Sequence, residues 1–309
     1  MNSVNSPEFA RNYGFWNEAE QQAIMNASVA IAGVGGDGFQ LGQKLARMGV
    51  QSFDIADPEV FEAENINRVP GATNKTLGQN KAEVFRDMVH EINPEAKVRV
   101  YTDGITEDNV QEFMSRSTLV FDETELTHLD LGTMVSDEAR RRSIPDVFIM
   151  NVGFAAQITS FHPEGRHSFR TMMGIPKDMP IDEVKDLKLD ISRCLPSLPS
   201  YADMRTLEAV ANDEDAPLPS ISQGVDVASA LGSSQAFLHM TKDVKNHRKD
   251  PIWAPRFGFM DSMTLESGVI RMPRTAFYRR LGTMMIREKL GINSSASFTK
   301  ADRDRRKGV

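Results

Sequence analysis

The chain has 309 residues, of which 40% are hydrophobic and 26% charged, the balance of a soluble globular protein with a large core. Its formal net charge is −7 and its pI is about 5.5, which argues against a nucleic-acid-binding surface as its main function. A single cysteine, Cys194, excludes an internal disulfide and a multi-cysteine zinc site.

The clearest pattern of predicted elements runs from residue 28 to residue 57. "SVAIAG" is a short β-prone apolar run, and "GFQLGQKLARMG" places apolar residues at helical spacing. "VQSFDIAD" then predicts a second strand. A strand–helix–strand unit of this length implies a parallel pair of strands joined by a right-handed crossover.

The alternation continues to residue 152. Helices are predicted at 76–93, ending before Pro94, and at 109–116 and 129–143. Strands are predicted at 97–101, 118–122 and 146–152. Alternation of this kind predicts an α/β fold with a doubly wound, mostly parallel, Rossmann-like sheet.

The pattern changes after residue 152, and we expect a C-terminal mixed or antiparallel extension over residues 153–309. It begins with a predicted strand, "QITSFHP", and continues with an irregular crossover or lid at about 174–220. A small-residue helix follows at about 221–241, capped by Ser220 or Ser222, and then one strand and one helix. We expect this part to form one compact domain with the nucleotide-binding core of residues 1–152.

A glycine-rich loop follows the first predicted strand. Gly33, Gly35, Gly36 and Gly38 fit the pattern G-x-G-x-x-G, in which the backbone turns tightly and approaches phosphates at a helix N-terminus. Asp57 ends the second predicted strand, where an acidic residue binds the ribose of a nucleotide. Asp37, inside the loop, would add an unwelcome negative charge near a phosphate.

Three polar residues then follow the second predicted strand, at the same edge of the sheet as the glycine loop. Asn65, Arg68 and Lys81 supply an amide and two cations, which suit a triphosphate that gathers charge as it reacts. Either cation alone is more often an ordinary surface charge. Together they favour nucleotidyl transfer over the hydride transfer that the glycine loop alone would also allow.

The stretch from about Phe9 to Val152 resembles the ThiF/MoeB family of adenylating enzymes, which includes the ubiquitin-activating enzymes. The segments that carry the resemblance occur in order and evenly spaced: "RNYGF…EQQAI", "VAIAGVGGDG", "LARMGVQSFDIADPEVFEAENINR", "LGQNKAEV", "INPEAKV" and "LVFDETE". A later segment, residues 219–241, looks like a helix of the same family. The resemblance implies activation of a carrier-protein or peptide C-terminus with MgATP, which releases pyrophosphate and leaves an acyl-adenylate.

The resemblance also implies a role for each matching residue. The glycine loop, Asp57, Glu59, Asn65, Arg68 and Lys81 would bind ATP, and the last three would act on its phosphates. Arg11 would reach into the site of the partner subunit, so we expect a homodimer. Glu125 would bind magnesium, with Asp122 as a possible second ligand, because carboxylates suit a hard cation that bridges phosphates.

The chain departs from the family pattern at several positions. Family members usually have Asp where this chain has Glu59 and Glu125, and Gln where it has Val69. The paired CxxC zinc site of many members is absent, so no zinc is expected. Cys194 lies in the crossover, where thioester-forming members place their nucleophile, but a lone half-buried cysteine without a catalytic role is the favoured interpretation.

The leading hypothesis is therefore an ATP- and magnesium-dependent adenylyltransferase whose partner is a small carrier protein or peptide with a free C-terminus. The alternatives are a catalytically impaired relative that binds nucleotide or a partner as a scaffold, and an NAD-dependent oxidoreductase. No apolar run approaches the roughly 20 residues that span a bilayer, and the start of the chain lacks a signal-peptide pattern. We expect a cytoplasmic protein with no membrane or nucleic-acid partner.

Overall fold

The computed structural model describes residues 3–202, 219–244 and 248–290. Much of the predicted crossover, residues 203–218, lies outside the described residues. The strands are β1 (Ser28–Ala32), β2 (Ser52–Ala56), β3 (Lys97–Tyr101), β4 (Leu119–Asp122), β5 (Asp146–Val152), β6 (Ala155–Phe161), β7 (Phe257–Asp261) and β8 (Ser267–Ile270).

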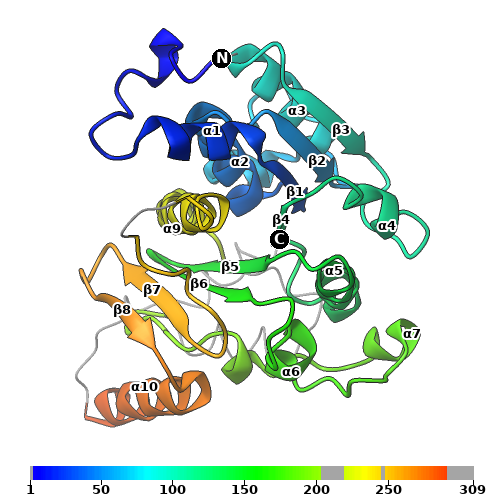
Figure 1. The fold of residues 1–309 in the computed structure, drawn as a ribbon. Helices are drawn as coiled ribbons and strands as arrows, with labels where there is room; N and C mark the ends of the chain where they lie inside the picture. The colour runs from blue at the N-terminus through cyan, green and yellow to red at the C-terminus, as the bar shows by residue number, and fades with distance from the viewer. Residues whose placement is uncertain (1–2, 203–218, 245–247, 291–309) are drawn as a thin grey trace.

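The helices lie between these strands and at both ends of the described chain (Figure 1). The α-helices are α1 (Glu18–Asn26), α2 (Gly36–Met48), α3 (Lys81–Ile92), α4 (Val110–Phe113), α5 (Leu129–Arg141), α6 (Phe169–Met173), α7 (Ile181–Val184), α9 (Ser222–Met240) and α10 (Pro273–Lys289). The 3-10 helices are η1 (Pro7–Phe9), η2 (Ala63–Asn67) and η3 (Ile191–Arg193). None of the helices in the described ranges is long and apolar enough to cross a membrane.

All eight strands form one sheet in the order β3-β2-β1-β4-β5-β6-β7-β8. The strands from β3 to β5 in this order pair in parallel. β6, β7 and β8 continue the sheet beyond β5, and each of them is antiparallel to the strand before it in this order. The predicted fold class, a mostly parallel doubly wound sheet with an antiparallel C-terminal extension, is confirmed.

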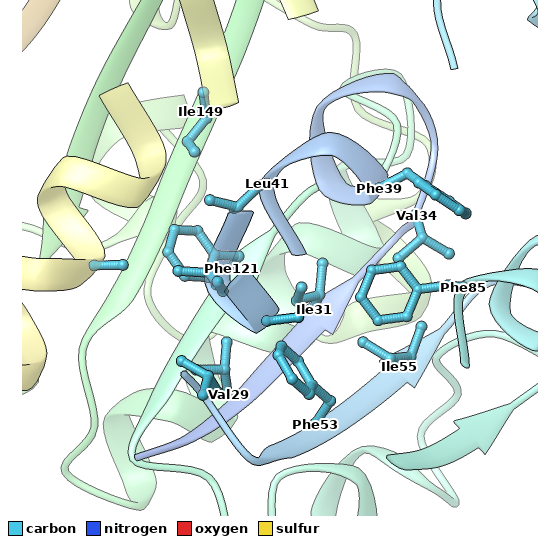
Figure 2. Close-up of a cluster of buried hydrophobic side chains, with 14 of the residues drawn as sticks. Val29, Ile31, Val34, Phe39, Leu41, Phe53, Ile55, Phe85, Phe121 and Ile149 are labelled. Atoms are coloured by element: carbon cyan, nitrogen blue, oxygen red, sulfur yellow. The ribbon is translucent and has the colours of Figure 1, made fainter. Parts of the chain in front are cut away.

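The main core lies on the face of the sheet that α1, α2, α3 and α9 cover (Figure 1). Alternate residues of β1, β2, β4, β5 and β6 point into it, and phenylalanines from α2, β2, α3 and β4 pack around β1 (Figure 2). Aromatic edges meet there: the rings of Phe39 and Phe85 have centroids 5.4 Å apart. The opposite face carries a second core of smaller residues beneath α4 and α5.

Helix α9 packs against α2 and the sheet through small residues. A Cβ atom added to Gly232 would lie 2.5 Å from Ile149 Cδ1, and one added to Gly224 would lie 2.3 Å from the Gly153 carbonyl oxygen. Bulkier residues would hold the helix away from the sheet. The expected cap is wrong: the N-cap of α9 is Ile221, and no side chain caps the helix.

Several elements differ from the sequence-based expectation. The helix predicted from residue 76 begins at Lys81, because Asn80 caps it by accepting from the amides of Ala82 and Glu83. The part after residue 152 has three strands instead of the two expected, because β7 was missed; it pairs with β6 on one side and with β8 on the other. Helix α1 was also missed, although its Asn17 and Glu20 form a capping box.

The same Gly-to-Ala substitution should have opposite effects in two helices. In α2, a Cβ on Gly42 would lie 2.3 Å from Phe85 Cε2 in the packed core, so Gly42→Ala should destabilise the protein by about 1–3 kcal/mol. In α10, a Cβ on Gly282 meets nothing within 4 Å, so Gly282→Ala should stabilise it by about 0.5–1 kcal/mol. Urea denaturation of both variants measures the difference, and equal effects would contradict the packing described.

Candidate functional site

The candidate site lies where the order of the parallel strands reverses. β1 pairs with β2 on one side and with β4 on the other. In an open α/β sheet, ligands bind at this reversal point, at the carboxyl ends of the strands. The glycine loop follows β1 and Asp57 follows β2, so both predicted nucleotide-binding features reach this point.

The glycine loop makes contacts that a larger residue could not make. Gly33 has a φ of +97°, and a Cβ on it would lie 2.2 Å from the Glu123 carbonyl oxygen. A Cβ on Gly38 would lie 2.1 Å from the Gly33 carbonyl oxygen. Gly35 is the N-cap of α2, and no side chain caps this helix. The amides of its first turn and the helix dipole therefore favour an anion at the loop.

Asp57 fixes the glycine loop to the end of β2. Its buried carboxylate accepts hydrogen bonds from the amides of Val34 (2.8 Å) and Glu59 (2.9 Å). Burial raises the pKa of the Asp57 carboxyl, and the two amides and nearby Lys81 act in the opposite direction. A carboxylate has about four acceptor positions, so two accepted bonds leave capacity for a ribose hydroxyl.

Lys81 and Glu59 form an ion pair at the start of α3. The Lys81 side chain is buried, whereas the Glu59 side chain is 57% exposed. The Lys81 amide also donates to the Glu59 carbonyl oxygen (2.9 Å), and Asn80 Nδ2 donates to the Asp57 carbonyl oxygen (3.0 Å). These bonds hold the start of α3 against the end of β2.

Arg68 lies beside the glycine loop. It ends η2, and its Cγ lies 3.9 Å from the position of a Cβ on Gly36, the first residue of α2. Its Nη1 donates to the Glu64 carbonyl oxygen (3.0 Å) and to Asn67 Oδ1 (2.9 Å). The fold thus brings a predicted phosphate ligand to the N-terminus of α2.

Asn65 has a local role in this structure. Its Oδ1 accepts from the Glu62 amide (3.0 Å) in the capping box of η2, and its side chain is buried. It therefore shapes the turn that carries Arg68. Val69, which stands where the family usually has Gln, is buried in the main core.

Asp37 turns toward a residue that the sequence did not single out. Its Oδ2 accepts from the backbone amide (3.2 Å) and from the side-chain amide (2.8 Å) of Asn151, at the end of β5. Burial raises the pKa of the Asp37 carboxyl to about 7, while Asn151 and nearby Arg68 act in the opposite direction. The only indication of this contact in the sequence is that an acidic residue, Asp37, stands inside a glycine loop and so needs a hydrogen-bond donor.

Two acids lie at the end of β4: Asp122, which is buried, and Glu123, which is half-buried. Asp122 Oδ1 accepts from the Thr124 amide (3.2 Å) and hydroxyl (2.7 Å), while its Oδ2 faces α5, 2.8 Å from the position of a Cβ on Gly132. Burial raises the pKa of Asp122 to about 6. Burial and the nearby charges of Asp37 and Asp122 raise the pKa of Glu123 well above its usual value. Glu123 was not among the predicted site residues.

Glu125, the other predicted metal ligand, lies at the surface. Its side chain is 68% exposed and is 3.8 Å from His128 Nε2. Within the described ranges, no group of three or more His, Cys, Asp or Glu residues is arranged to hold a metal ion. A magnesium ion that takes most of its ligands from phosphates and water needs only one or two protein carboxylates, and an exposed Glu125 fits that requirement.

Cys194 is fully buried in an apolar cluster beneath the sheet. Its thiol donates to the Ile191 carbonyl oxygen (3.6 Å), and burial raises its pKa to about 12. A thiol in this environment stays protonated and out of contact with solvent. Arg11 is exposed in the segment between η1 and α1.

The chain matches the model of a known protein family, described as "ThiF family", over residues 9–275. It is 36% identical over 106 residues to a tRNA threonylcarbamoyladenosine dehydratase of Escherichia coli, covering 34% of this chain and 38% of that protein. It is 28% identical over 147 residues to a sulfur carrier protein adenylyltransferase of Thermus thermophilus, covering 48% and 54%. The chain thus matches less than two thirds of the length of these curated relatives.

A solved structure shares the fold. E. coli MccB, crystallised with ATP, superposes with a TM-score of 0.62 over 89% of this chain and 74% of that chain. The two sequences are 15% identical, so the likeness concerns the fold.

Asp37 should make the stability of the protein depend on pH. Because its folded pKa is raised from 3.8 to about 7, the folded state holds a proton that the unfolded chain releases from about pH 4 upward. Its contribution to stability is present at low pH and is lost as pH rises to about 7. Asp37→Asn keeps an oxygen for both Asn151 donors and removes the charge, so it should stabilise the protein at pH 8.

The gain from Asp37→Asn should be on the order of 1 kcal/mol or more at pH 8 and smaller at pH 5. Urea denaturation at both pH values measures it. A gain that does not change between pH 5 and pH 8 would mean that the Asp37 carboxyl titrates normally.

Proposed function

Because the chain belongs to the ThiF family, we propose that it adenylates the C-terminal carboxylate of a small carrier protein or peptide. The observation that carries the proposal is the position of Arg68 beside the uncapped N-terminus of α2. A cation and a helix N-terminus on one loop suit the phosphates of ATP. The phosphates of a nicotinamide dinucleotide do not react in hydride transfer, so a cation placed to stabilise charge that develops on a phosphate favours adenylation.

In the proposed reaction, a carboxylate oxygen of the acyl substrate attacks the α-phosphorus of ATP. A bond forms between these two atoms, and the bond from the α-phosphorus to the bridging oxygen of the β-phosphate breaks. Pyrophosphate leaves with that electron pair, and the acyl-adenylate remains. The name of the Thermus relative, a sulfur carrier protein adenylyltransferase, supports a carrier protein as substrate.

We assign each predicted residue a part in binding ATP. Asp57 would accept from the ribose, and the glycine loop would hold the phosphates against the start of α2. Arg68 and Lys81 would neutralise charge on the phosphates, and Glu59 would hold Lys81 in place through their ion pair. Asn65 would act through the turn that it caps.

We propose that Glu125 holds a magnesium ion together with the ATP phosphates. The ion would supply positive charge next to the reacting phosphates. Asp122 is a weaker candidate ligand because its Oδ2, the carboxylate oxygen without a hydrogen-bond partner, faces α5. Its bonds to Thr124 instead shape the loop that presents Glu125.

The remaining proposals concern assembly. We propose a cytoplasmic homodimer in which Arg11 reaches the site of the partner subunit. Residues 1–152 would form the adenylation core, and residues 153–309 would complete it. Cys194 would take no part in adenylate formation, because its thiol is buried and protonated.

A carboxylate carried on tRNA is the second candidate substrate. The observation that favours it is the similarity to tRNA threonylcarbamoyladenosine dehydratases over about a third of the chain. The net charge of −7 disfavours it, since binding to a nucleic acid rests on positive charge. A catalytically impaired scaffold and an NAD-dependent oxidoreductase remain the alternatives that the experiments below separate.

The proposal predicts ATP–pyrophosphate exchange that depends on a carrier protein or peptide with a free C-terminus. Arg68→Ala should lower exchange on the order of 100-fold or more, since the lost cation stabilises charge in the transition state. Cys194→Ser serves as the control and should retain activity. Exchange with tRNA alone would favour the second candidate, and tight NAD binding without ATP binding would contradict adenylation.

Glu125 should matter through its charge. Glu125→Gln keeps the size of the side chain and removes the charge, so metal-dependent exchange should fall on the order of 100-fold while folding is unaffected. Glu125→Asp should retain much of the activity, because it restores the usual acid of the family. A fully active Glu125→Gln beside an inactive Asp122→Asn would show that Asp122 is the ligand instead.

A further inference from the structure

Ser220 joins two parts of the candidate site that are far apart in the sequence. It lies immediately before α9, and its hydroxyl donates to Asn151 Oδ1 (3.0 Å) at the end of β5. The backbone amide and the side-chain amide of the same Asn151 each donate to Asp37 in the glycine loop. The Ser220 hydroxyl is therefore linked to the phosphate-binding loop through one side chain.

The backbone of Ser220 serves the other part of the site. Its carbonyl oxygen accepts from Asn67 Nδ2 (3.0 Å), and Asn67 Oδ1 accepts from Arg68 Nη1 (2.9 Å). Asn67 thus uses its donor for Ser220 and its acceptor for Arg68. Ser220 is therefore linked to the glycine loop through Asn151 and to Arg68 through Asn67.

We propose that Ser220 and Asn151 are positioning residues, which set the distance between the glycine loop and Arg68 for the phosphates of ATP. We call the four residues Asp37, Asn67, Asn151 and Ser220 the Ser220 clamp. The inference deepens the proposed function and rests on it, since it concerns how the same ATP site is held in shape.

The bonding pattern separates this role from helix capping. No side chain caps α9, so the Ser220 hydroxyl does not satisfy a helix amide. Ser222, two residues later, offers a matched comparison, because its hydroxyl donates to the neighbouring Gln223 (3.3 Å) at the surface. The clamp instead joins the segment after β2, the end of β5, the start of α2 and the residue two positions before α9.

The proposal predicts a loss that is specific to phosphates. Ser220→Ala removes one hydrogen bond of the clamp and should weaken MgATP binding about 3- to 10-fold. Ser220→Thr keeps the hydroxyl and should bind as the wild type does, and so should the control Ser222→Ala. Adenosine binds through the base and ribose alone, so its affinity should be unchanged in every variant.

A charge exchange tests the Asp37–Asn151 link directly. Asn151→Asp places two carboxylates together and should weaken MgATP binding by more than Ser220→Ala does. The double variant Asp37→Asn/Asn151→Asp again has one amide and one acid, now with the amide in the glycine loop and the acid on β5. It should therefore regain most of the lost affinity for MgATP. Isothermal titration calorimetry with MgATP, a competition titration with adenosine, and thermal unfolding curves supply the measurements.

Three outcomes would overturn the inference. Unchanged MgATP affinity in Ser220→Ala and Asn151→Asp would remove the clamp and leave the proposed function standing. An equal loss of affinity for adenosine and for MgATP would show that the clamp supports the structure of the site in general and does not position the phosphates. A wild-type protein that binds no MgATP would overturn the proposed function itself, and the clamp with it.

Discussion

The contact between Gly33 and the Glu123 carbonyl oxygen governs the arrangement of the site. A Cβ on Gly33 would stand 2.2 Å from that oxygen, well inside the distance at which two atoms repel, so only glycine fits. This contact lets the chain leave β1 and turn into α2 directly against the end of β4. The helix N-terminus, the acid at the end of β2 and Arg68 then meet around one loop. Widening that turn would move the glycine loop away from Asp57 and Arg68.

The first half of the fold follows from the sequence because each parallel strand needs a crossover helix, which gives a regular alternation of patterns. The C-terminal half lacks this constraint. β7 has the sequence FGFMD, and its Gly258 lies against Ile252, so its pairing depends on neighbours and not on a long β-prone run. The start of α3 was misplaced for a local reason, since Gly78 takes a left-handed conformation (φ +79°) and Asn80 then caps the helix.

The candidate site likewise contains residues that could be predicted from the sequence and residues that could not. Asp57, Arg68 and Lys81 could be predicted because they stand at fixed distances from the ends of strands. Asn151 could not, because it meets Asp37 across 114 residues of sequence, and no spacing rule reaches that far. Ser220 was singled out for the wrong role, since a serine before a helix usually caps it. Tertiary contacts gave its hydroxyl a different partner.

Helix α9 has a further consequence for how the protein is made. The main core includes Val227, Ala228 and Ala236 of α9, which cover apolar residues of α2 and β5. A ribosome finishes β5 at Val152 but does not finish α9 until Met240, 240 − 152 = 88 residues later. At about 5–20 residues per second, this delay is roughly 4–18 seconds. For that time the part of the apolar face that α9 covers, over α2 and β5, stays exposed, and it must be shielded from aggregation until α9 emerges.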